Sequence, residues 1–151
     1  MTGKLKKAIA SLMAFATLST CAVGVSASAS TSPTTIPSVQ LAPMNNGTWN
    51  YTSTRAKADN SKAYLYVVSG TCTPLVKICG TNSSSATGGA NCTRNSSNTA
   101  VSYLSCSVGG TLYIKNNVRD KYNYANLGFQ SSYSSMGGSV QVSWAPDSNV
   151  Y

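Results

Sequence analysis

The chain has 151 residues, with 11 basic residues against 3 acidic ones and no histidine. That length allows one domain of ordinary size, and only 9% of the residues are charged, well below the share of about a quarter in typical soluble proteins. The absence of histidine excludes a Ser-His-Asp triad and most catalysis that needs a side chain titrating near neutral pH.

The first 29 residues have the three parts of a secretory signal peptide. Residues 1–7 are basic, an apolar run follows over 8–25, and Ala27-Ser28-Ala29 fits a cleavage site. We therefore expect removal of residues 1–29 and a mature chain that begins at Ser30, with cleavage after Ala27 as the alternative.

Two alternatives to secretion start from the same segment. Polar residues such as Ser11 and Thr17 interrupt the apolar run, which argues against a stable transmembrane anchor. Lipid anchoring through Cys21 is the second alternative, but Thr20 before it fits a lipidation box poorly. We expect a secreted, extracellular protein.

The segment after the signal, residues 30–46, contains three prolines and many small polar residues. This composition predicts a flexible Pro/Ser/Thr-rich arm. A short edge strand at Val39 and Leu41 is the alternative. From residue 47 the pattern changes to two-residue alternation, which predicts one β domain over residues 47–151.

Short segments of this domain are rich in residues that favour strands, and clusters of Gly, Asn and Ser separate them. The predicted strand segments are 49–54, 62–68, 75–79, 101–104, 112–114, 125–130 and 140–144. Residues 55–62 are the only segment for which a helix is an alternative, and they are too short and too poor in regularly spaced apolar residues to favour it. The predicted fold class is all-β, a small antiparallel β-sandwich or barrel stapled by two disulfides and preceded by a signal peptide.

Four cysteines follow the signal: Cys72, Cys79, Cys92 and Cys106. In a small exported domain such a set is typical of two disulfides. Their spacing lacks the close Cys-x-x-Cys pair of zinc sites, so no metal is expected. Three connectivities are possible, and an antiparallel pairing of residues 75–79 with 100–105 favours Cys72–Cys106 with Cys79–Cys92 nested inside it.

The acidic residues do not suggest catalysis. Asp59 and Asp120 lie beside basic residues as solvated turn charges do, and Asp147 follows Pro146 in a turn sequence. Paired carboxylates for hydrolysis and a calcium loop are therefore not expected, and no phosphate-binding glycine loop precedes a helix. We expect no enzyme activity, no catalytic residues and no cofactor.

Tyrosine is the conspicuous chemistry that remains, because all nine tyrosines follow residue 50. Amphipathic rings beside amides and basic groups suit contact with a glycan or a membrane interface, although tyrosines also pack ordinary sheets. The predicted surface-binding residues are one pair on a strand face and one basic-aromatic cluster: Tyr64 and Tyr66, and Arg119, Lys121, Tyr122 and Tyr124.

Charge points to the same kind of partner. Without residues 1–29, eight basic residues and three aspartates give 8 − 3 = +5 over 122 residues. This suits an anionic cell envelope or glycan, and simple solubility is the alternative. Nucleic acid, another partner of basic domains, does not fit an exported protein.

A series of short motifs runs through the chain: Arg55-Ala56-Lys57 with residues 61–67, Gly110–Val118, Tyr122 with Ala125-Asn126-Leu127, and Trp144-Ala145-Pro146-Asp147-Ser148. The series resembles a family of small secreted proteins of Gram-positive bacteria that typically end in Trp-Ser-Pro-Asp-Ser, and Ala145 stands here for the usual serine. The resemblance covers about residues 48–148.

The resemblance implies an exported β-protein without an established activity, with some members encoded near bacteriocin-type transport genes. It also implies structural roles for the C-terminal motif, with Trp144 as a core anchor and Pro146, Asp147 and Ser148 as a closing turn. The expected function is a non-enzymatic secreted module that binds the envelope or another extracellular surface. The alternative is a bacteriocin-like antimicrobial protein or its accessory factor.

Overall fold

Alternation of apolar and polar residues builds most of the strands in the computed structural model, which describes residues 31–149. Short 3₁₀ turns, labelled η, are the only helical elements in this range. In chain order the elements are β1 (Thr34–Leu41), η1 (Met44–Asn46), β2 (Asn50–Tyr51), β3 (Arg55–Ala56), β4 (Ala63–Gly70), β5 (Pro74–Thr81), β6 (Ala90–Asn91), β7 (Thr93–Arg94), β8 (Leu104–Ser105), β9 (Thr111–Asn116), η2 (Val118–Asp120), β10 (Tyr124–Ser131) and β11 (Gly138–Ala145).

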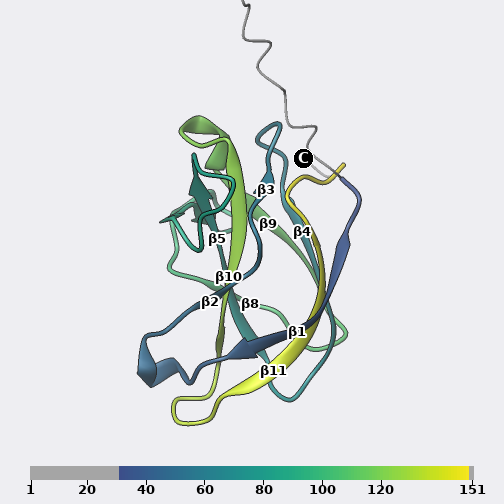
Figure 1. The fold of residues 1–151 in the computed structure, drawn as a ribbon, viewed down its shortest axis with the longest axis vertical. Coiled ribbons are helices and arrows are strands. Elements are labelled where there is room, and N and C mark those ends of the chain that lie inside the picture. Colours follow the sequence, from purple (N-terminus) through teal and green to yellow (C-terminus); the bar gives the residue numbers. More distant parts are fainter. Residues whose placement is uncertain (1–30, 150–151) are drawn as a thin grey trace, which may run out of the picture.

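The strands form two antiparallel sheets that face each other (Figure 1). The first sheet has the strand order β1-β11-β4-β9-β7. The second has the order β2-β10-β5-β6, with β3 also beside β10 and β8 also beside β5. The prediction of an all-β antiparallel fold is therefore confirmed, in the form of a sandwich.

Side chains from both sheets fill the space between them. Because successive residues of a strand point to opposite faces, every second residue of the four longest central strands enters the core. The main core residues are Ala63, Leu65 and Val67 of β4, Val76 and Ile78 of β5, Ala125, Leu127 and Phe129 of β10, and Val140, Val142 and Trp144 of β11.

The predicted flexible arm at residues 30–46 is wrong for residues 34–41, which form β1. This strand pairs with β11 along its length, from Thr34 opposite Trp144 to Leu41 opposite Gly138. Val39 and Leu41 are buried in the core. The edge-strand alternative is the observed structure, and Figure 1 shows β1 lying beside β11.

The predicted strand at 125–130 is confirmed as β10, which is one residue longer at each end and central to the second sheet. It pairs with β5 over all eight residues, from Tyr124 opposite Thr81 to Ser131 opposite Pro74. Gly128 is required where the chain passes beneath an aromatic ring, because a Cβ there would lie 2.7 Å from Cε1 of Tyr51. Its lack of a side chain weakens the strand pattern and lets Tyr51 cover the sheet.

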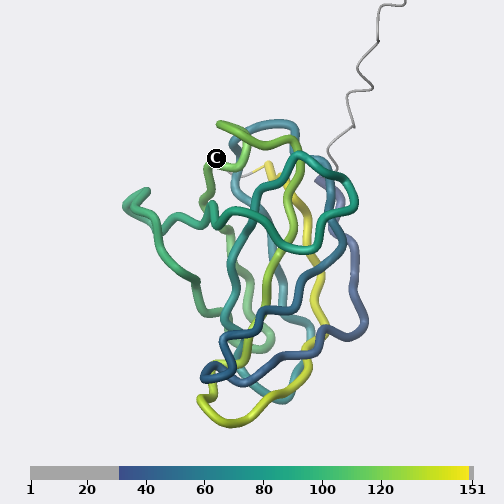
Figure 2. The backbone as a smooth tube through the Cα atoms, turned by 60° about the vertical axis from the view of Figure 1, so that its left-hand side comes forward, coloured from purple at the N-terminus to yellow at the C-terminus, as the bar shows by residue number. Residues whose placement is uncertain are grey.

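Other segments differ in extent from their predictions. Within the predicted strand 101–104, only Leu104 belongs to β8, and the chain between β7 and β8 projects from the sandwich (Figure 2). The segment 55–62, for which a helix was the alternative, begins with β3 instead.

The predicted signal peptide, its cleavage site and Cys21 lie outside the described residues. Within residues 31–149, no helix is long and apolar enough to cross a membrane.

Candidate functional site

The outer face of the first sheet carries a group of tyrosines. Alternation along β4 buries Leu65 and directs Tyr64 and Tyr66 outward. Tyr113 of β9 lies opposite Tyr64 in the ladder, and the two ring centroids are 5.7 Å apart at an interplanar angle of 60°. Tyr113 is 43% exposed. We call Tyr64, Tyr66 and Tyr113 the tyrosine face.

Basic residues continue this face toward one end of the sheet. Ala63 and Ile114 face each other in the core, so their neighbours Lys62 and Lys115 stand on the outer side beside the tyrosines. Arg94 of β7 is the register partner of Lys115. None of the three aspartates of the chain lies on β4, β9 or β11. The face is therefore aromatic and basic.

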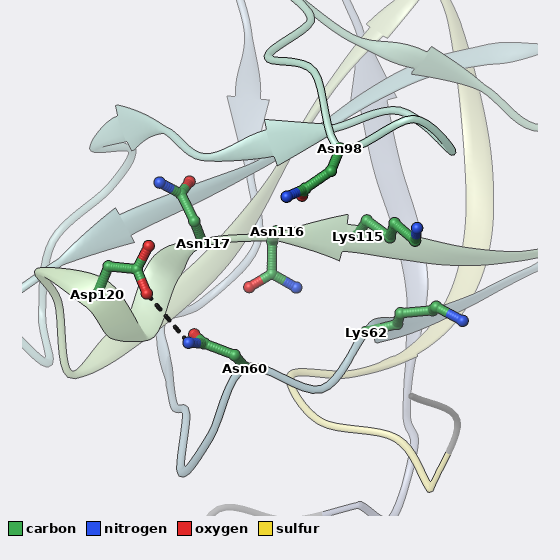
Figure 3. Close-up of a pocket in the computed structure, with 7 residues that line it drawn as sticks. All are labelled: Asn60, Lys62, Asn98, Lys115, Asn116, Asn117 and Asp120. Atoms are coloured by element: carbon green, nitrogen blue, oxygen red, sulfur yellow. Dashed lines mark hydrogen bonds between the residues drawn. The ribbon is translucent and has the colours of Figure 1, made fainter.

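An open pocket of about 480 Å³ lies at the basic end of the face, within the size range of ligand sites. Every side chain that lines it is polar or charged. The lining residues, drawn in Figure 3, are Asn60, Lys62, Asn98, Lys115, Asn116, Asn117 and Asp120.

Hydrogen bonds fix the walls of this pocket. Asn116 Nδ2 donates to the carbonyl oxygens of Ser61 (3.2 Å) and Ile114 (3.1 Å), and its Oδ1 accepts from the Val118 amide at 3.3 Å. Asn60 Nδ2 donates to Asp120 Oδ1 at 3.0 Å. These bonds connect the segment before β4, strand β9 and η2, so the pocket is formed before any ligand enters.

The turn that carries Asn98 closes another side. Asn98 has a left-handed φ of 60°, which asparagine tolerates better than most residues. The amide of Asn95 donates to Thr99 O and the amide of Thr99 donates to Asn95 Oδ1, each at 2.9 Å. Lys115 Nζ donates to Ser96 O at 2.8 Å and so holds the same turn against β9.

The predicted cluster around residues 119–124 lies apart from the tyrosine face. Tyr122 is half-buried against the core, with its ring over Gly80, where a Cβ would clash with Cδ2 of the ring. Tyr124 belongs to β10 of the second sheet. The structure therefore does not bring Tyr122 and Tyr124 together with Tyr64 and Tyr66.

The two basic residues of that cluster differ in their surroundings. Arg119 donates to Ala58 O at 3.2 Å, to Tyr122 O at 3.4 Å and to Asn123 Oδ1, so its guanidinium joins two loops. Lys121 is exposed, and its carbonyl oxygen accepts a bond from Asn82 Nδ2 at 3.4 Å. Asp120 between them is the part of this turn that reaches the pocket.

The four cysteines after residue 30 are buried free thiols, so the two predicted disulfides are not present in the structure. The strand register explains why Cys79 is not bonded to Cys92, because Cys79 lies opposite Asn91. Cys92, the next residue, therefore points to the other side of the sheet, where it joins the core. Cys72 and Cys106 also lie in the core without a bond between them.

Burial acts on the chemistry of these thiols. It raises the pKa of Cys79 from 9.0 to about 11, and it also raises the pKa of Cys92 and of Cys106. A thiol is nucleophilic as the thiolate, so these three cysteines are suited to packing. Within residues 31–149, no three His, Cys, Asp or Glu side chains are grouped so that they could hold a metal ion.

The C-terminal motif contains a buried ion pair that sequence reasoning missed. Lys57 Nζ donates to Asp147 Oδ1 at 2.8 Å, Ser61 O at 2.8 Å and Pro146 O at 2.7 Å, which uses all three ammonium protons. Burial lowers the pKa of Lys57, and Asp147 opposes that shift. A buried lysine needs a partner charge, but only the structure shows that Lys57 is buried, so the sequence alone contains no signal for the pair.

Arg55 joins the same motif from β3. Its Nη1 donates to Trp144 O at 2.7 Å, and its guanidinium carbon lies 5.4 Å from the centroid of the Trp144 ring. Trp144 itself is 1% exposed and packs in the core. Two motifs separated by almost 90 residues in the chain therefore meet in the fold.

Comparison with known proteins adds family membership and no activity. A family model described as a protein of unknown function (DUF2712) matches residues 26–148. No curated protein and no solved structure matches the chain. The predicted resemblance to a family without established activity is confirmed at this level, and the Gram-positive origin and the terminal motif of that family stay predictions.

Proposed function

The chain belongs to the DUF2712 family of proteins of unknown function, and we propose from its geometry that it is a non-enzymatic, secreted module that binds an anionic cell envelope or another extracellular surface. The tyrosine face beside Lys62 and Lys115 carries this proposal. Secretion through the signal peptide at residues 1–29 is part of it. Of the predicted binding residues, the proposal keeps Tyr64 and Tyr66 and adds Tyr113.

The distribution of charge supports an anionic partner. Residues 31–149 contain eight basic residues and three aspartates. The pairing of Lys57 with Asp147 uses one of each in the interior, so seven basic residues stand against two acidic ones elsewhere. Electrostatic attraction of this kind raises the rate and selectivity of association with anionic surfaces.

The tyrosines support contact with sugars or a similar amphipathic surface. A tyrosine presents an apolar ring together with a polar hydroxyl, and it loses little side-chain conformational entropy on binding. Three such rings on adjacent strands of the sheet form a half-exposed aromatic platform, in which the rings of Tyr64 and Tyr113 are tilted against each other. Such a platform fits an extended polymer better than a deep small-molecule cleft would.

The acidic residues support the non-enzymatic part. Asp147 is held by Lys57, by the amide of Ala58 at 3.2 Å and by the hydroxyl of Ser61 at 3.3 Å. Asp59 accepts a hydrogen bond from the Ser61 amide at 2.7 Å. Asp120 accepts from Asn60. Each carboxylate thus has a structural partner.

The bacteriocin-like alternative is also based on the positive charge of the protein, and no feature of residues 31–149 gives it further support.

The test is binding of fluorescently labelled protein to Gram-positive cells. We expect the double variant Tyr66→Ser/Tyr113→Ser to bind at least about tenfold more weakly, because the loss of each ring removes about 1 kcal/mol of binding free energy. The fold should survive, since both residues lie on the outer face. Substitution of Tyr122 is not suitable for this test, because its ring packs against the core and its loss would also affect the fold.

A matched control removes the same number of exposed rings elsewhere. Tyr103 and Tyr133 are 43% and 48% exposed and lie outside the first sheet, so Tyr103→Ser/Tyr133→Ser should bind as the parent does. Equal loss in both double variants, or full binding by Tyr66→Ser/Tyr113→Ser, would contradict the assignment of the tyrosine face.

A further inference from the structure

We propose that the pocket at the basic end of the tyrosine face recognises an anionic polyhydroxylated unit, that is, a sugar or polyol that bears a phosphate or a carboxylate. This inference rests on the proposed function and assigns a ligand class to one part of that surface. It adds a discrete site with one-to-one stoichiometry to a broad, adhesive face.

The composition of the pocket selects for a hydrophilic ligand. Ligand sites are usually lined mainly by apolar side chains, whereas every lining residue here is polar or charged. Its volume of about 480 Å³ admits a single sugar-sized unit. A polyhydroxylated unit replaces bound water with equivalent hydrogen bonds, which an apolar ligand cannot do.

The two lysines place the anionic group. Their side chains run in the same direction at one end of the pocket, while Asp120 lies at the other end (Figure 3). Lys115 uses one ammonium proton on Ser96 O and keeps two for a ligand. An ammonium group at this end of the pocket attracts a phosphate or carboxylate through charge-assisted hydrogen bonds, which are stronger than neutral ones.

Asp120 and the asparagines suit the hydroxyl groups. Asp120 would repel an anion placed beside it, so it orients the ligand with its charge toward the lysines and its hydroxyls toward the carboxylate. Asn60 spends an N–H on Asp120 Oδ1 and keeps its amide oxygen as an acceptor, and Asn98 supplies a further amide. A bare anion without hydroxyls would meet the lysines and leave these groups unused.

The site is rigid and continuous with the tyrosine face. Asn116 is locked by three hydrogen bonds, so the pocket needs little reorganisation to bind, which favours affinity. Lys62 directly precedes β4 and is two residues from Tyr64, and Lys115 is two residues from Tyr113 on β9. A charged unit in the pocket could therefore be followed by neighbouring sugars of the same polymer along the tyrosines.

The experiment is a calorimetric and NMR titration of the purified protein with four probes: glycerol phosphate, glucuronate, inorganic phosphate and glucose. We expect both hydroxylated anions to bind at least about tenfold more tightly than glucose or inorganic phosphate, with amide shifts centred on residues 60–62, 98 and 115–120. The ratio of glycerol phosphate to glucuronate affinity identifies phosphate or carboxylate as the preferred anion.

Three variants locate the site. Lys62→Gln and Lys115→Gln should each weaken glycerol phosphate binding about tenfold, the loss of one charge-assisted contact, whereas the matched control Lys121→Gln should not. Asp120→Asn should improve binding of inorganic phosphate and so reduce the preference for hydroxylated anions. Equal binding by Lys62→Gln and the parent, no binding of either hydroxylated anion, or amide shifts elsewhere would overturn the inference.

Cell binding separates this inference from the function on which it rests. If Lys62→Gln binds glycerol phosphate poorly and cells normally, the pocket is a ligand site and the tyrosine face acts alone, so the link to the polymer is wrong. If the parent binds the probes at the pocket and no cells at all, the surface-binding function fails and the ligand class of the pocket stands.

Discussion

At the level of single residues, the buried pair of Lys57 and Asp147 holds the C-terminal segment onto the sandwich. Lys57 makes all three of its hydrogen bonds to Ser61, Pro146 and Asp147. Lys57→Met would leave the Asp147 carboxylate buried without its counter-charge and would take the lysine donor from Pro146 O and Ser61 O, of which Ser61 O keeps the bond from Asn116 Nδ2. We expect a loss of about 3–5 kcal/mol in the free energy of unfolding, measured by urea titration.

The double variant Lys57→Met/Asp147→Leu gives the matching comparison. Replacing both partners removes the uncompensated charge, so the double variant should be more stable than Lys57→Met alone. A loss below about 1 kcal/mol in Lys57→Met, or a double variant less stable than the single one, would show that the pair does not hold the motif.

Burial of Cys79 gives the reduced protein an alkaline dependence of stability. Its pKa is raised from 9.0 to about 11, so between these values the unfolded chain has lost a proton that the folded chain keeps. The stabilisation is complete below pH 9 and is lost as the pH rises toward 11, with a slope of up to about 1.4 kcal/mol per pH unit.

The measurement is the free energy of unfolding under reducing conditions at pH 7, 9 and 10 for the parent and for Cys79→Ala. The small cavity left by Cys79→Ala lowers the free energy of unfolding by the same amount at each pH. The difference between the parent and the variant at pH 7 therefore measures this cost. The alkaline slope should be shallower in Cys79→Ala, while Cys92 and Cys106, whose pKa values are also raised, keep part of it. Parallel slopes would exclude Cys79 as the source.

At the level of elements, strands with clean alternation are predicted from the sequence and strands that depend on distant partners are not. Strand β4 alternates Tyr64 and Tyr66 with core residues, and its prediction is confirmed. Strand β1 contains Pro37 and mostly exposed residues, so its local composition resembles a linker. Its pairing with β11 is a property of the tertiary fold, which residues 30–46 alone do not encode.

The candidate site follows the same division. Tyr64 and Tyr66 are found from alternation within one strand. The pocket combines Asn60 and Asn98 from two loops with Asp120 of η2, all far apart in sequence, and Asn98 adopts a left-handed turn. Amides and lysines in an Asn-rich chain give no local signal. Tyr122, predicted from its basic neighbours, instead fills the space above Gly80.

At the level of the whole molecule, the fold and the proposed binding depend on different kinds of electrostatics, and salt separates them. Seven basic residues and Asp59 and Asp120 remain outside the buried pair. Raising NaCl from 0.1 M to 1 M shortens the Debye length from about 10 Å to about 3 Å, which screens exposed charges much more than buried ones.

Cell binding should therefore weaken at least about tenfold over this range of salt, while the free energy of unfolding changes by no more than about 1 kcal/mol, because the pair of Lys57 and Asp147 is shielded from solvent. Parallel binding and urea titrations at both salt concentrations make the comparison. Salt-independent binding would assign the contact to the tyrosine rings alone, because ring stacking does not involve exposed charges. A parallel loss of stability would instead mean that the surface cations support the fold itself.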